Sequence, residues 1–257
     1  MCLILMAWRV HPEYPIVIAA NRDEFHRRPT AAAQWWPDRP RLLAGRDLEA
    51  GGTWLGITAD GQLAALTNYR DPRQIKSHAP SRGGLVLQVL ESRASIAGRL
   101  SQLHAVGAQY SGFNLLCTDG SELGVYESVA DSGRLLAPGI YGLSNHLLDT
   151  PWPKVQRAKS QLAQAIGSLP DSTALLELLR DDSVPDDDEL PRTGVSLEWE
   201  RLLSSAFIAT GDYGTRSSTV IRIAADGSAN FREWTWRPDG SPGGEVAYEF
   251  QLDSPAR

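Results

Sequence analysis

The chain opens with Met1-Cys2-Leu3-Ile4-Leu5-Met6-Ala7-Trp8, and after a short turn it continues with Tyr14-Pro15-Ile16-Val17-Ile18-Ala19-Ala20-Asn21-Arg22-Asp23-Glu24. Short apolar runs separated by turn residues predict an antiparallel pair of strands, here over residues 2–10 and 14–21. The first strand then begins at a cysteine, and the second ends in four polar residues. This pair is where the interpretation of both fold and function begins.

Cys2 has a chemical use that depends on its position. Methionine aminopeptidase removes Met1 when the second residue is small, and the mature chain would then begin with a thiol and a free α-amino group on one residue. An α-amino group has a pKa of about 7.7 to 8, so it accepts a proton at neutral pH. Asp23 is the nearest candidate carboxylate to hold that amine. The alternative is that Cys2 is a small buried residue of a first strand.

The composition is that of an ordinary globular protein. The chain has 257 residues, of which 42% are hydrophobic and 22% charged, and it carries a net charge of -6. This size and the lack of a Gly/Ser-rich linker predict a single domain over residues 1–257. An acidic chain argues against nucleic acid as a partner, since nucleic acid favours a basic surface. Two cysteines, Cys2 and Cys117, are too few for a disulfide scaffold.

The apolar start does not have the pattern of an export signal. No basic residue precedes the apolar run, and no cleavage-like segment follows Arg9. No stretch of about 18 apolar residues occurs, so we expect no transmembrane segment. These features are compatible with a cytoplasmic location.

The rest of the chain alternates between blocks of strands and blocks of helices. Further strands are predicted at residues 53–58, 62–68, 113–118, 123–128, 139–144, 206–210, 217–223, 229–236 and 246–252. Helical spacing or helix-start signals predict helices from about residue 82 to 90 and at 95–104, 153–169 and 172–179. Residues 25–49 are expected to be irregular, and about 180–197 to form an acidic loop or lid.

Strands grouped in two blocks, with helices between and after them, indicate an α+β fold and not alternating βαβ units. Two antiparallel sheets packed together with helices outside, a four-layer αββα sandwich, satisfy this pattern.

Several motifs resemble the NRDE family, also named the transport and Golgi organisation protein 2 family. Besides Asn21-Arg22-Asp23-Glu24 they are Gly51-Gly52-Thr53-Trp54-Leu55-Gly56, Thr67-Asn68-Tyr69-Arg70, Ser81-Arg82-Gly83, Gly142-Leu143-Ser144-Asn145-His146 and Tyr213-Gly214-Thr215-Arg216-Ser217-Ser218-Thr219. That family is similar to cysteine N-terminal nucleophile hydrolases, including penicillin V acylase and bile salt hydrolase. The similarity implies the same αββα sandwich.

Carried over position by position, the resemblance implies a catalytic site made of Cys2, Asp23, Asn68, Asn145, Arg216 and Arg22. Cys2 would be the nucleophile, Asn68 would help to form the oxyanion hole, and Arg216 would lower the thiol pKa. The alternatives are that Asn68 caps a turn and that Arg22 and Asp23 form a surface ion pair. Arg22 ranks below Asp23 because adjacent strand residues face opposite sides unless the strand bends.

The resemblance implies an amidohydrolase or acyltransferase that acts on a small amide or ester with an apolar acyl group and needs no cofactor. Trp35, Trp36, Trp152 and Trp199 are candidates to line the mouth of an apolar pocket. The five histidines show no metal-ligand spacing, so no metal site is expected.

The alternative is a carrier that uses the same scaffold without turnover. The family has been linked to haem mobilisation and to lipid homeostasis, which makes haem or a lipid-like molecule the candidate ligand. His26 and His146 are the candidate haem ligands, because they lie next to the proposed site motifs. Retention of Met1 would favour the carrier.

Overall fold

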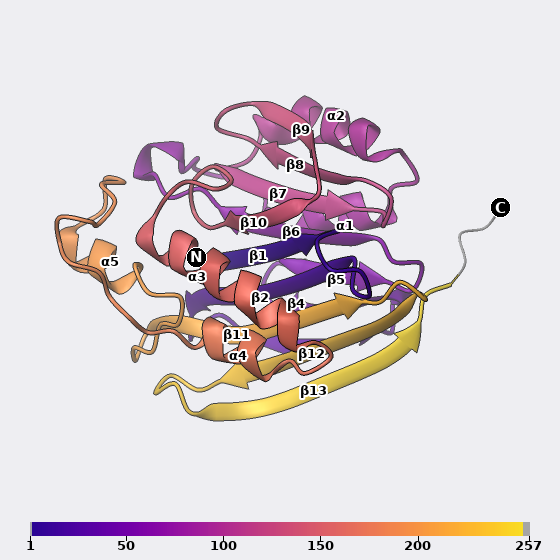
Figure 1. Ribbon diagram of the computed structural model, residues 1–257. Helices are drawn as coiled ribbons and strands as arrows, with labels where there is room; N and C mark the ends of the chain where they lie inside the picture. Colours follow the sequence, from indigo (N-terminus) through magenta and orange to yellow (C-terminus); the bar gives the residue numbers. More distant parts are fainter. Residues whose placement is uncertain (1, 254–257) are drawn as a thin grey trace.

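The structure, a computed structural model, describes residues 2–253 and consists of two antiparallel sheets packed face to face, with helices on their outer sides (Figure 1). The first sheet has the order β10-β1-β2-β11-β12-β13 and the second the order β3-β4-β5-β6-β7-β8-β9. Helices α3 (Pro153–Ala165) and α4 (Thr173–Leu179) cover the first sheet, and α1 (Gly83–Glu91) and α2 (Ile96–Gly107) cover the second. The predicted αββα sandwich is therefore confirmed.

The strands of the first sheet are β1 (Cys2–Trp8), β2 (Ile16–Phe25), β10 (Gly139–Leu143), β11 (Tyr213–Ile223), β12 (Ser228–Trp236) and β13 (Pro242–Gln251). Those of the second are β3 (Thr30–Trp36), β4 (Arg39–Asp47), β5 (Leu55–Thr58), β6 (Leu63–Asn68), β7 (Phe113–Thr118), β8 (Leu123–Glu127) and β9 (Ser132–Leu136). Short helices are α5 (Leu197–Leu202) and two 3₁₀ turns, Pro72–Gln74 and Ile166–Ser168. No helix within residues 2–253 is both long enough and apolar enough to cross a bilayer.

Strand β1 is apolar throughout because both of its faces are buried. Leu3 and Leu5 pack against the layer of α3 and α4, whereas Ile4 and Met6 face the second sheet. Since side chains alternate along a strand, Cys2 continues the row of Ile4 and Met6 between the sheets. The first residue of β1 thus places its thiol at the open end of the inter-sheet core.

The expectation of an irregular stretch at residues 25–49 was wrong, because β3 and β4 lie there. The apolar residues 42–44 are buried in β4, and the Trp36 indole donates a hydrogen bond to the Ala44 carbonyl oxygen at 3.0 Å. The strand was not recognised in the sequence because it begins with Arg39-Pro40-Arg41. These residues are polar or rigid, and they occupy the more exposed start of β4.

The predicted strand at 206–210 is also absent, since only Ala209 forms a bridge there, to Gly214. The acidic segment 182–188 contains no helix or strand, and α5 begins at Leu197. Strand β9 and helix α5 were not predicted. The remaining elements lie where they were expected and differ mainly at their ends. For example, α2 begins one residue after Ser95, whose hydroxyl caps it by accepting the Gly98 N–H at 3.2 Å.

A buried carboxyl group joins the two sheets. Glu233 on β12 is 1% exposed and accepts a hydrogen bond of 2.7 Å from the backbone N–H of Ala33 on β3. Burial raises the pKa of Glu233 from its ordinary value of 4.5 to about 7, although its hydrogen bonds oppose the rise. Glu233 is therefore largely protonated in mildly acidic solution.

We expect Glu233→Gln to remove a pH dependence of stability. Because the folded pKa is raised, the unfolded chain binds fewer protons, so the contribution of Glu233 is complete below pH 4.5 and is lost as the pH rises to about 7. Relative to the variant, the wild type should lose on the order of 2–3 kcal/mol of unfolding free energy over that range. Urea unfolding at several pH values measures the difference, and parallel curves would contradict the prediction.

Candidate functional site

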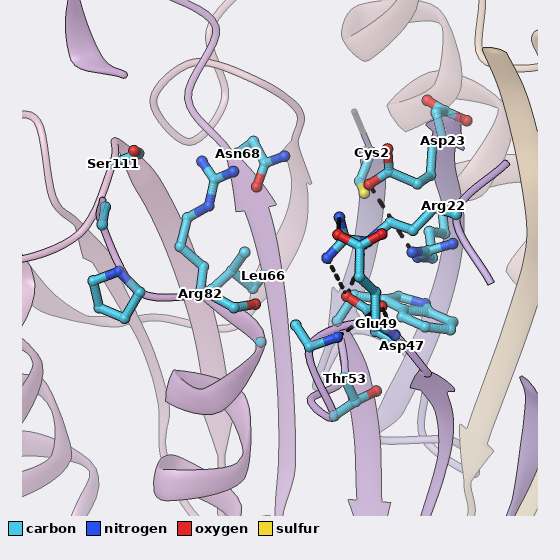
Figure 2. A pocket seen from close by; sticks show the side chains of 18 residues that line it. Cys2, Arg22, Asp23, Asp47, Glu49, Thr53, Leu66, Asn68, Arg82 and Ser111 are labelled. Carbon is cyan, nitrogen blue, oxygen red and sulfur yellow. Dashed lines mark hydrogen bonds and ion pairs between the residues drawn. The ribbon is translucent and has the colours of Figure 1, made fainter. Parts of the chain in front are cut away.

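A cavity of about 390 Å³ opens where β1 begins and where β2 and β6 end (Figure 2). Four of the predicted site residues line it: Cys2, Arg22, Asp23 and Asn68. Most of the other lining residues are polar or charged, and Trp54 and Leu66 supply apolar surface. Trp35, Trp36, Trp152 and Trp199 do not line this cavity, so the expected aromatic mouth is formed by Trp54 alone.

The Cys2 thiol is 9% exposed and lies opposite Arg22 in the β1–β2 pair. Burial raises the pKa of this thiol, and the charge of Asp23 raises it further. A hydrogen bond from the Asp23 backbone N–H and the charge of Arg22 lower it, but they do not reverse the shift. The sulfur is therefore protonated at neutral pH and needs a base before it can act as a nucleophile.

Asp23 is buried beside the thiol. Its Oδ1 accepts a hydrogen bond of 2.8 Å from the Thr215 hydroxyl on β11. Burial raises the pKa of Asp23, while the charge of Lys154 and the Thr215 hydrogen bond lower it. This carboxyl group is held rigidly within reach of the start of β1.

Arg22 and Asp23 both line the cavity even though they are adjacent on β2. The partner strand β11 shifts register between Thr215 and Ser217, opposite this pair, and such a bulge bends and twists the sheet locally. The Arg22 guanidinium lies 4.3 Å over the Trp54 ring and donates to the Thr30 hydroxyl at 3.1 Å. The bulge in β11 lies directly opposite the two adjacent residues that both reach the cavity.

Asn68, the last residue of β6, faces the cavity (Figure 2). Its carboxamide makes no hydrogen bond to another residue of the described chain, so its N–H groups are available to a ligand. Its backbone carbonyl accepts a hydrogen bond of 2.9 Å from the buried Asn145 side chain. The Ser144 hydroxyl in turn donates to the Cys2 carbonyl oxygen at 3.1 Å. Asn145 thus lies behind Asn68 and not in the cavity.

Arg216 is not brought to the nucleophile. It is the extra residue at the β11 bulge, and its Nη1 donates to the carbonyl oxygens of Phe25 and Arg28 at 3.0 and 2.9 Å. The bulge turns its side chain along the loop after β2. The structure therefore places Arg216 as a residue that fastens this loop.

Sequence reasoning missed a buried charged group behind Asp23. The Lys154 Nζ on α3 donates to the Leu203 carbonyl oxygen at 2.8 Å, and burial together with the charge of Arg70 lowers the pKa of Lys154 to about 7. Arg70 itself forms an ion pair of 2.7 Å with Glu200. One lysine in an amphipathic helix carries no signal of burial, so the sequence offered no way to find it.

Tyr213 is a second missed residue. It is 5% exposed, and its pKa is raised well above the ordinary value by burial and by the charges of Asp23 and Cys2. Tyr213 is the first residue of the motif that ends at Thr219, so the sequence did draw attention to it. The motif alone does not distinguish structural residues from functional ones.

Neither candidate haem ligand lines the cavity. The His146 Nδ1 bonds with the Thr150 hydroxyl at 2.9 Å, and its ring packs against those of Tyr69 and Trp152. His26 Nε2 is buried, and a side chain on Gly214 would come within 3.1 Å of it. An axial ligand needs an open nitrogen facing a flat cavity, so these residues do not fit haem. Haem binding by this chain stays a prediction.

We expect Asp23→Asn to lower the pH midpoint for alkylation of Cys2 by iodoacetamide. The carboxylate raises the pKa of the thiol, so its removal should lower the midpoint by roughly 0.5 to 1 pH unit. Peptide mass spectrometry resolves alkylation of Cys2 from that of Cys117. The exposed Asp38, which does not line the cavity, provides the control variant Asp38→Asn. An unchanged or higher midpoint in Asp23→Asn would contradict the prediction.

Asn21 precedes the site but supports the fold. Its Nδ2 donates to the carbonyl oxygens of Leu179 and Ala206 at 2.7 and 2.8 Å, and its Oδ1 accepts the Ser218 hydroxyl at 2.6 Å. Neither Asn21 nor the three residues that it bonds line the cavity.

We expect Asn21→Ala to destabilise the protein by about 2–4 kcal/mol, because it leaves three buried polar groups without their partner. Urea unfolding measures this change. Asn230→Ala serves as the matched control, since that side chain makes one exposed bond to Glu249 and should cost under about 1 kcal/mol. A small effect at Asn21 would show that solvent replaces its bonds.

The model of the family described as Transport and Golgi organisation 2 matches residues 1–238. The chain belongs to this family. It is 38% identical to the family's Bos taurus member, Transport and Golgi organization protein 2 homolog, over 99% of this chain and 100% of the relative. Identity to the Homo sapiens homolog is 34%, again over 99% of this chain and 100% of the relative.

Among solved structures, a mutant conjugated bile acid hydrolase from Clostridium perfringens superposes with a TM-score of 0.50 at 10% identity. The match covers 100% of this chain and 99% of that one. At this identity the likeness shows the fold alone, so this Transport and Golgi organisation 2 family member shares the fold of that hydrolase. The resemblance drawn from the motifs is therefore confirmed at the level of family and scaffold.

Proposed function

We propose that this protein is a cysteine N-terminal nucleophile hydrolase or acyltransferase. The observation that carries the proposal is that the Cys2 thiol, the Asp23 carboxyl group and the Asn68 carboxamide line one cavity, although they come from three strands of two sheets. The substrate is a small amide or ester. Its apolar acyl group fits the surface of Trp54 and Leu66.

The reaction begins when the Cys2 thiol passes its proton to the α-amino group of the same residue, and the sulfur attacks the carbonyl carbon. The oxyanion that forms accepts a hydrogen bond from the Asn68 amide. Collapse breaks the carbon–nitrogen or carbon–oxygen bond, and the leaving group takes the proton from the ammonium. Asp23 holds the amine throughout.

The second half of the reaction releases the acyl group from the Cys2 thioester. Water attacks the thioester carbon and gives up a proton to the amine. The carbon–sulfur bond then breaks, the sulfur is reprotonated, and a carboxylic acid leaves. In acyl transfer, an alcohol or amine replaces the water.

This mechanism requires removal of Met1, which lies outside the described residues. Intact mass spectrometry of the purified chain, before and after treatment with p-nitrophenyl acetate, tests the requirement. We expect a mass that lacks methionine and a single acetyl group on residue 2. Cys117 is the internal control, because burial raises its pKa to about 12 and it should stay unlabelled. A chain that keeps Met1 and takes up no acetyl group would overturn the proposal.

A further inference from the structure

Arg82 lies on the same side of the cavity as Asn68, across from Cys2 and Arg22 (Figure 2). It precedes α1, and its Nη1 donates to the Gly112 carbonyl oxygen at 3.0 Å, which anchors the half-buried side chain. Within residues 2–253, no carboxylate comes within ion-pair distance of Arg82. Arg82 takes no part in the proposed acyl transfer by Cys2, Asp23 and Asn68.

The other two cavity arginines already have partners. Arg28 donates two hydrogen bonds to Asp47, of 3.0 and 2.7 Å, and a third of 2.9 Å to Glu49. Arg22 stacks on Trp54, and Glu24 lies 4.0 Å from it. The lining carboxylates of Glu24, Asp47 and Glu49 thus lie beside these two arginines. Among the lining arginines of the described chain, Arg82 is the one without a carboxylate at ion-pair distance, so its charge is available to a ligand.

Other donors lie on the same wall. Ser111 lines the cavity, and its oxygen accepts the Lys76 N–H at 3.0 Å, which leaves the hydroxyl proton for a ligand. Gly83, the first residue of α1, also lines the wall, so the positive end of the helix dipole is on this side. A guanidinium, a hydroxyl and a helix start together suit negatively charged oxygens.

We propose that Arg82 binds an anionic group of the substrate, a carboxylate or a phosphate, and so orients the scissile carbonyl between Cys2 and Asn68. The inference rests on the proposed function in taking Cys2 as the reacting atom. It adds a substrate class: an amide or ester that carries a negative charge away from its acyl group.

Two alkylating reagents of similar size test this. Iodoacetate is an anion and iodoacetamide is neutral, and both alkylate the Cys2 sulfur. We expect Arg82→Gln to lower the ratio of the iodoacetate rate to the iodoacetamide rate by about 5- to 10-fold, because one nearby charge is lost. Arg82→Lys should keep most of the ratio. Arg27→Gln removes an exposed arginine outside the cavity and should leave the ratio unchanged.

The ratio separates two roles for Arg82. If Arg82 only stabilises the thiolate, Arg82→Gln slows both reagents equally, and that result overturns the inference. Circular dichroism of each variant confirms that it is folded.

A competition experiment identifies the anion. Inorganic phosphate and acetate, added at equal ionic strength, compete with iodoacetate in the wild type. The stronger competitor identifies the anion, and the absence of competition by either also overturns the inference.

Failure of this inference is distinguishable from failure of the proposed function. The alkylation ratio reports charge recognition in the cavity whether or not Met1 is removed, whereas the acetyl adduct reports acyl transfer. A normal adduct with an unchanged ratio in Arg82→Gln would leave the mechanism standing and remove the anionic substrate.

Discussion

Replacement of Cys2 by serine is expected to lower the rate of p-nitrophenol release from p-nitrophenyl acetate by at least about 10³-fold. The hydroxyl is a far weaker nucleophile than the thiol at neutral pH, and the cavity offers it no added base. Serine is also small, so removal of Met1 should proceed as in the wild type. The comparison therefore isolates the sulfur from the α-amino group.

Cys117→Ala is the matched control for this measurement. Cys117 is 1% exposed and does not line the cavity, so its loss should leave the rate within a few-fold of the wild type. If Cys2→Ser retained more than about a tenth of the activity, another residue would have to be the nucleophile.

Replacement of Asn68 by alanine is expected to slow acylation of Cys2 by roughly 10²- to 10³-fold, the typical cost of losing one oxyanion donor. The carboxamide is free of other side-chain bonds within the described chain and faces the same cavity as the thiol. Stopped-flow release of p-nitrophenol measures the first turnover. Iodoacetamide reactivity should change little, because alkylation forms no oxyanion.

Asn68→Asp makes the comparison sharper, because a carboxylate has the same shape but cannot donate. It should be at least as slow as Asn68→Ala. Asn230→Ala, on the remote strand β12, controls for the loss of an asparagine in general. If Asn68→Ala slowed acylation and alkylation equally, the substitution would act on the reactivity of the Cys2 thiol and not on the stability of the oxyanion.

The fold was predictable where a strand is buried on both faces. The run from Leu3 to Trp8 is apolar because α3 covers one face and the second sheet the other, and no partner needs to be known to recognise it. β3 and β4 were missed because one face of their start is exposed and carries arginine and proline. Local patterns describe such half-covered strands poorly, since the packing partner is distant in sequence.

The site was predictable where residues stand at strand ends within a motif, as Cys2, Asp23 and Asn68 do. Arg216 does not line the cavity because it sits at a bulge. Such a bulge is set by how β11 pairs with β2, and a single sequence does not reveal register. Lys154 could not be found, because only tertiary packing buries it beside Asp23. Arg82 belongs to the motif Ser81-Arg82-Gly83, but the sequence does not show whether a carboxylate of the chain lies close enough to pair with it.

The ion pair of Arg70 with Glu200 and the bond from Lys154 to Leu203 fasten the chain around α5 to the back of the cavity. These attachments begin after the acidic segment 182–188, which is largely exposed and contains no helix or strand. A protease cut within 182–188 would therefore yield two fragments that stay associated and keep the cavity assembled. The same segment is the place where a reporter peptide can be inserted without disturbing the cavity.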